Sequence, residues 1–147
     1  MNWLGFTRFM LAVLFLIFPV AVSSAGDSWP QLQGNAQRSG NVADEVVSES
    51  LGLAGTVALS DGIYASPVIS DGTAYVIDGS GIVFAIDLAT LRIKWKFATE
   101  GGAGNCNNVA APAVAGKLLH VGTTAGYYYV LNRADGAVVK RLDLKEP

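Results

Sequence analysis

The chain has 147 residues, with 10 Lys and Arg against 12 Asp and Glu, one His and one Cys, and a net charge of −2. Because no basic stripe is present to meet a phosphate backbone, nucleic-acid binding has little support. A lone Cys106 excludes an internal disulfide, and one His with one Cys provides too few ligands for a transition-metal site.

The amino terminus has the pattern of a secretory signal peptide. Arg8 precedes an apolar run of fourteen residues, 9–22, and the small residues Ser-Ser-Ala follow at 23–25. A membrane anchor is the alternative, but a span needs about 20 apolar residues, and Pro19 interrupts this run. We expect residues 1–25 to be cleaved, which leaves no stable membrane span. The mature protein is then exported, to the periplasm or the extracellular space.

Residues 26–53 are expected to form a polar, extended lead-in, and residues 54–147 have the sequence pattern of short strands separated by turns. An early strand is expected at 54–59. Four runs of β-branched, aromatic and small apolar residues follow at 64–69, 73–77, 82–87 and 93–98, with Asp71-Gly72 and an Asp-Gly-Ser-Gly segment at 78–81 between them. Asp-Gly between apolar runs is a strong hairpin signal. The pattern predicts a four-stranded antiparallel meander.

The same meander recurs after 45 residues without a gap, so that Pro67 aligns with Pro112 and Gly81 with Gly126. A period of 40 to 50 residues with four strands per unit is typical of a β-propeller. Residues 82–86 and 127–131 are apolar on both faces, as expected for sheets stacked between neighbours. We therefore predict an all-β, incomplete propeller with one blade at about 64–98 and another at about 109–144.

The connection between the third and fourth predicted strands of the first blade carries a recognisable motif. Ala85, Asp87, Thr90 and Trp95 stand at the spacing A-x-D-x-x-T-G-x-x-x-W, and Leu91 departs from the expected Gly. This resembles the tryptophan-docking motif of the pyrroloquinoline-quinone-like, or quinoprotein-type, β-propeller repeats. The Asp and Thr would bond turn backbone, and the Trp would cover the turn of a neighbouring blade.

The second copy of this motif is eroded. Asn132 replaces the Asp, Asp135 replaces the Thr and Lys140 replaces the Trp, whereas Gly136 is kept. The structural docking motif is therefore predicted at Ala85, Asp87, Thr90, Trp95, Asn132, Asp135 and Gly136.

The resemblance implies two classes of function. The first is an exported, non-catalytic module that binds or scaffolds proteins in the cell envelope, with no cofactor and with an unknown protein partner or further propeller blades as its neighbours. The second is the amino-terminal fragment of a dehydrogenase that oxidises alcohols or sugars with pyrroloquinoline quinone and calcium. Family propellers close with six to eight blades, so two repeats are expected to be a fragment, a truncated reading frame or one piece of an assembly.

No constellation of side chains predicts a catalytic residue or a metal site. Cys106 and His120 could form a thiol–imidazole pair, but His120 aligns with Tyr75 of the first repeat, which favours packing. Asp71, Asp78 and Asp87 recur at turns, where bonding to the backbone accounts for them. The residues that would contact a cofactor stay unknown.

Overall fold

The computed structural model describes residues 28–41, 50–101 and 108–145. The predicted signal peptide at 1–25 and Cys106 lie outside these residues. Within them the chain forms two four-stranded antiparallel sheets, with the strand orders β1-β2-β3-β4 and β5-β6-β7-β8, and no helix. The strands are β1 (Val68–Ser70), β2 (Thr73–Ile77), β3 (Ile82–Asp87), β4 (Arg92–Ala98), β5 (Ala113–Ala115), β6 (Leu118–Gly122), β7 (Tyr127–Asn132) and β8 (Val138–Asp143). The predicted all-β meanders are confirmed.

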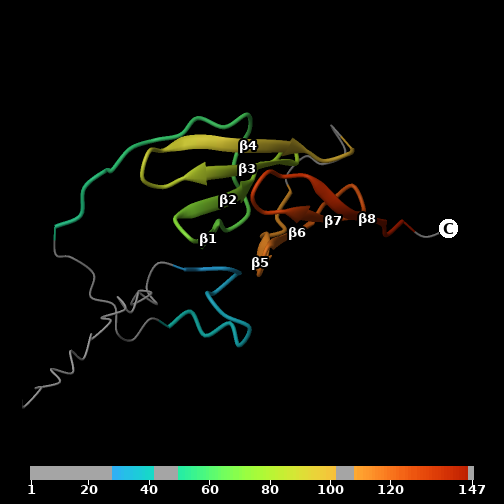
Figure 1. Ribbon diagram of the computed structural model, residues 1–147, viewed down its shortest axis with the longest axis horizontal. Coiled ribbons are helices and arrows are strands. Elements are labelled where there is room, and N and C mark those ends of the chain that lie inside the picture. The colour runs from blue at the N-terminus through green and yellow to red at the C-terminus, as the bar shows by residue number, and fades with distance from the viewer. Residues whose placement is uncertain (1–27, 42–49, 102–107, 146–147) are drawn as a thin grey trace, which may run out of the picture.

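The two sheets lie side by side and do not close into a ring (Figure 1). Asp71 and Gly72 both have positive φ, 48° and 66°, which gives the tight β1–β2 turn its twist. The third and fourth strands of each sheet shift register at a bulge, between Ala85 and Ile86 in the first sheet and between Val130 and Leu131 in the second. The recurrence of the bulge at the same place in both sheets reflects the 45-residue repeat.

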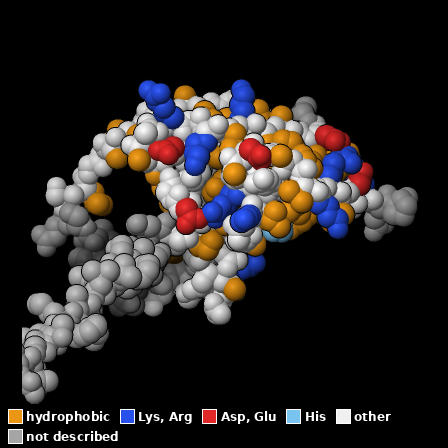
Figure 2. Space-filling view, in the orientation of Figure 1, with side chains coloured by type: hydrophobic (Ala, Val, Ile, Leu, Met, Phe, Trp, Pro, Cys, Tyr) orange, Lys and Arg blue, Asp and Glu red, His pale blue; other side chains and the backbone are white. Residues whose placement is uncertain are grey.

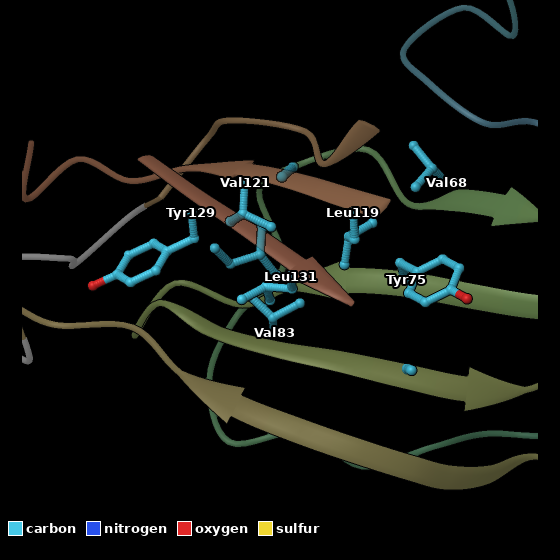
Figure 3. Close-up of a cluster of buried hydrophobic side chains, with 10 residues drawn as sticks. Val68, Tyr75, Val83, Leu119, Val121, Tyr129 and Leu131 are labelled. Atoms are coloured by element: carbon cyan, nitrogen blue, oxygen red, sulfur yellow. The ribbon is translucent and has the colours of Figure 1, made fainter. Parts of the chain in front are cut away.

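The core fills the space between the two sheets (Figure 3). Alternate side chains of β2 and β3 meet alternate side chains of β6 and β7 there, and Phe97 packs edge-on against Tyr129, with ring centroids 5.3 Å apart. The buried apolar members that meet at this seam are Val68, Tyr75, Ile77, Val83, Ala85, Leu119, Val121, Tyr129 and Leu131. Tyr129, the last residue of the run of three tyrosines at 127–129, is buried at this seam, as expected for sheets stacked between neighbours.

The opposite face of the first sheet is also covered. Ala74, Val76, Phe84 and Ile86 form a second buried cluster, against which Val57 and Leu59 pack. All five residues of β2 are buried, because both faces of this sheet meet other parts of the chain.

The strand expected at 54–59 is wrong, because this segment lies across the face of the first sheet and makes no ladder. The edge where such a strand could pair is already occupied. Trp29 forms an isolated antiparallel bridge with Ile69 of β1, with N–H···O distances of 2.7 and 2.8 Å. The amide of Val114 in β5 donates to the carbonyl of Pro30 at 2.7 Å. The lead-in therefore joins the inner edges of both sheets.

The first strand of each sheet is short, and β1 begins at Val68 instead of at residue 64. Pro67 precedes β1 and Pro112 precedes β5, and proline cannot donate to a ladder.

Within the described residues, no helix is long and apolar enough to cross a membrane.

Candidate functional site

The seam between the sheets contains the side chains that the sequence marked as a docking motif. Trp95 lies on β4 opposite Ala85, and its indole reaches the turn between β7 and β8 of the other sheet. The indole Nε1 donates to the carbonyl of Arg133 at 3.1 Å. The centroids of the Trp95 and Tyr75 rings lie 6.0 Å apart. A half-buried indole with its one donor satisfied provides both apolar contact and orientation.

The indole rests on Gly136, which is buried beneath it. A Cβ placed on Gly136 would lie 2.7 Å from Cε3 of Trp95, closer than van der Waals contact permits. Gly136 also has φ 75°, a left-handed conformation that favours glycine. Two independent constraints therefore require glycine at this position.

In the first copy of the motif, Asp87 holds its own turn. One carboxylate oxygen, Oδ1, accepts hydrogen bonds from the amide and from the hydroxyl of Thr90, both at 2.8 Å. These two bonds and, to a smaller degree, the charge of Lys94 lower the pKa of Asp87 below its ordinary value. Leu91 takes the place of the motif's glycine with φ 55°, and its side chain lies against Gly55 of the segment that covers this sheet.

In the second copy, Asn132 and Asp135 still bond to turn backbone. The Asn132 Oδ1 accepts the amide of Ala134, and the Asp135 Oδ1 accepts the amide of Ala137, both at 3.0 Å. The amide of Gly136 donates to the carbonyl of Asn132, as that of Leu91 does to Asp87 in the first copy. The turn shape is therefore preserved although its side chains have changed, and Lys140 is exposed where a second Trp would stand.

Asp78 is the most enclosed carboxylate of the described chain, with no exposed surface. Its side chain accepts hydrogen bonds from Ser60, at 2.5 Å, from Ser80, at 2.8 Å, and from the amide of Ile82, at 2.9 Å. Burial acts to raise the pKa of Asp78, but these hydrogen bonds outweigh it and lower the pKa overall. Asp78 therefore stays ionised and ties the covering segment to the β2–β3 turn.

His120 does not meet a thiol among the described residues. Its Nδ1 lies 2.9 Å from the hydroxyl of Tyr128, with the rings 6.0 Å apart, on the face of the second sheet that points away from the seam. Cys106 lies outside the described residues. Within the part of the chain that is described, no three His, Cys, Asp or Glu side chains gather as ligands for a metal ion.

Arg133 is a seam residue that the motif did not indicate. Its guanidinium pairs with the carboxylate of Asp71 and donates to the hydroxyl of Ser70 at 2.8 Å. Its carbonyl accepts from Trp95 and, at 3.5 Å, from the hydroxyl of Tyr75. The 45-residue alignment places Arg133 over Leu88, so a change from apolar to basic between repeats was the available signal.

A family model described as outer membrane protein assembly factor BamB matches residues 53–147. The chain belongs to this family. The curated protein named outer membrane protein assembly factor BamB from Legionella pneumophila (strain Paris) is 26% identical over 102 residues, which cover 63% of this chain and 26% of that protein. The chain thus spans about a quarter of the length of this family relative.

Solved structures share the fold of the chain. The quinohemoprotein alcohol dehydrogenase from Comamonas testosteroni superposes with a TM-score of 0.67 at 23% identity, over 86% of this chain and 21% of that one. BamB from Moraxella catarrhalis gives a TM-score of 0.50 at 24% identity, over 59% of this chain and 25% of that one. The predicted membership of the quinoprotein-like propellers is confirmed.

Proposed function

We propose that the chain is part of an exported, non-catalytic β-propeller module that binds or scaffolds proteins in the cell envelope. The observation that carries this proposal is the family match over residues 53–147, whose description is an outer membrane protein assembly factor. The relative from Legionella pneumophila bears the same description. The signal-peptide pattern at residues 1–25 agrees with an envelope location, in the periplasm.

The outer strand of the second sheet offers a surface for such a partner. β8 is the last strand of its sheet, and all six of its residues are exposed. No strand pairs with its outer edge among the described residues, and an unpaired edge can receive an extended peptide. Val139 is 59% exposed on this strand, which supplies an apolar contact beside the free backbone groups.

A fragment of a quinone- and calcium-dependent dehydrogenase is the alternative that the repeat class implies. The likeness to solved dehydrogenases supports the fold and leaves the chemistry open. The carboxylates at the turns are engaged within the protein: Asp71 pairs with Arg133, Asp78 accepts bonds from two serines, and Asp87 holds the turn at Thr90. Among the described residues, no three His, Cys, Asp or Glu side chains gather as ligands, and we derive no step through the quinone or calcium.

The proposal is tested by binding. A fluorescently labelled, urea-denatured outer-membrane β-barrel protein is diluted into the purified chain, and its anisotropy is followed. We expect saturable binding that Val139→Lys weakens, because the new charge stands on the contact strand. Leu88→Lys is the matched control, since Leu88 is 40% exposed in the β3–β4 turn and the variant also replaces an exposed aliphatic side chain by lysine, away from β8.

The competing function is tested with the same preparation. The chain is incubated with pyrroloquinoline quinone and calcium, and reduction of an artificial dye by ethanol or glucose is measured. Dye reduction that depends on both additions would overturn the non-catalytic assignment. Absence of saturable binding to the denatured barrel protein, or equal weakening by both lysine variants, would overturn the role given to β8.

A further inference from the structure

The two repeats differ in charge at one end of the seam. At four aligned positions the first repeat has two acidic and two neutral residues, whereas the second has two neutral and two basic residues. The aligned pairs are Asp71 with Gly116, Gly72 with Lys117, Asp87 with Asn132, and Leu88 with Arg133. The turns that carry these residues, β1–β2 with β3–β4 and β5–β6 with β7–β8, stand at the same end of their sheets.

A cavity of about 480 Å³ opens between these turns. Its wall includes Thr73, Tyr75, Lys94, Lys117, Asn132 and Arg133. Figure 2 shows Lys and Arg side chains near the centre of this face of the molecule, with acidic side chains beside them. The cavity lies at the carboxyl end of β3 and of β7, where Tyr75, a core side chain labelled in Figure 3, forms part of its wall.

The lining holds three cations and one carboxylate, that of Asp71. Arg133 uses one N–H for Asp71 and one for Ser70, and a guanidinium has five such donors, so part of its hydrogen-bonding capacity is left. Lys94 donates to the neutral hydroxyl of Thr73 at 3.2 Å. Lys117 has no acidic partner among the described residues.

Asp87 is the other carboxylate close to this group, and its charge acts on Lys94 from outside the lining. Its Oδ1 is already committed to the amide and hydroxyl of Thr90. Even with Asp87 counted, the three cations outnumber the two carboxylates, and Lys117 belongs to the second repeat whereas both carboxylates belong to the first. The described carboxylates therefore leave a net positive charge at this cavity, which would attract an anion.

We propose that this cavity binds a small dianion, a phosphate or a dicarboxylate, held by Lys117, Lys94 and the free donors of Arg133. Three convergent cationic donors suit the oxygens of either group. The site is distinct from the strand edge of β8 and does not depend on the partner proposed for that edge.

The test is calorimetric titration of the purified mature chain, without residues 1–25, with inorganic phosphate and, separately, with succinate at low ionic strength. We expect one anion to bind per chain, and we expect Lys117→Gln to weaken binding about fivefold, the upper range for an exposed ion pair. Lys140→Gln is the matched control, because it removes the same charge from an exposed position on β8.

Saturation by phosphate alone would assign a tetrahedral oxyanion, and saturation by succinate would assign a carboxylate ligand; either supports the site. Saturation by neither anion overturns it. Equal weakening by Lys117→Gln and Lys140→Gln also overturns it, because the effect is then one of net charge. Far-UV circular dichroism and the urea midpoint establish that both variants are folded before titration.

Discussion

The contact between Trp95 and Gly136 permits a quantitative test of the docking motif. Gly136→Ala adds one methyl group at a residue with φ 75°, and this methyl would lie 2.7 Å from the indole. The substitution therefore combines backbone strain with a clash, and both effects oppose the packing of the β7–β8 turn against Trp95.

The two costs can be separated with a second glycine. Gly116 has φ 58° and no atom within 4 Å of an added Cβ, so Gly116→Ala measures the backbone cost alone. A left-handed alanine costs about 1 to 2 kcal/mol, and overpacking typically adds about 1 to 3 kcal/mol. We expect Gly116→Ala to lose about 1 kcal/mol of unfolding free energy and Gly136→Ala to lose about 3 kcal/mol.

The assay is urea denaturation followed by far-UV circular dichroism, which does not depend on the indole as a probe. A double-mutant cycle with Trp95→Ala decides the cause. Without the indole, Gly136→Ala should cost no more than Gly116→Ala. If Gly136→Ala costs the same with and without Trp95, the clash is not what destabilises the protein, and the docking role of Gly136 is refuted.

Three further outcomes are expected. Asp78→Asn should lower the unfolding free energy by about 2 kcal/mol, because a buried, multiply hydrogen-bonded carboxylate is replaced; an unchanged urea midpoint would contradict this. The pKa values of Asp78 and Asp87 are lower in the folded protein than in the unfolded chain. Their ionised carboxylates therefore stabilise the folded state fully above the unfolded pKa of about 3.9, and this stabilisation is lost as the pH falls through the lower folded pKa values. The urea midpoint should therefore decrease as the pH drops below about 4. The decrease should be less steep for Asp78→Asn, and equal slopes for the variant and the parent protein would show that Asp78 does not cause the loss of stability in acid. Tyr129→Phe removes the hydroxyl that accepts the Glu100 amide at 3.0 Å and should cost about 1 kcal/mol by urea denaturation; no loss would show that water replaces the bond.

Much of the fold could be predicted because its determinants are local. The Asp71-Gly72 turn and the 45-residue period rest on residues close together in the chain, and β2 and β3 match their predicted bounds. The segment at 54–59 could not be predicted, because its fate depends on Trp29, which pairs with Ile69 and occupies the edge of β1. A strand pattern specifies what a segment can pair with, whereas competition for an edge depends on distant residues.

The contacts at the seam also divide into those that depend on a local motif and those that depend on residues far apart in the sequence. Trp95 and Gly136 were recognisable because the motif has fixed spacing, and the structure places them in contact. Asp71 and Arg133 meet across 62 positions of sequence, and neither belongs to the motif. Leu91 stands where the motif has Gly, yet it keeps the left-handed conformation, and its side chain packs against Gly55.

The lead-in also constrains the order in which the protein can assemble. The hydrogen bonds of Trp29 can form only when Ile69 is in place. That of Pro30 can form only when Val114 is in place, 84 positions later in the chain (30 to 114). Closing such long loops carries an entropic cost that local hairpins do not bear. During synthesis from the amino terminus this segment is therefore available at once, but its hydrogen bonds form only after the second sheet has begun to form. Residues that are synthesised early are thus among the last to reach their final contacts.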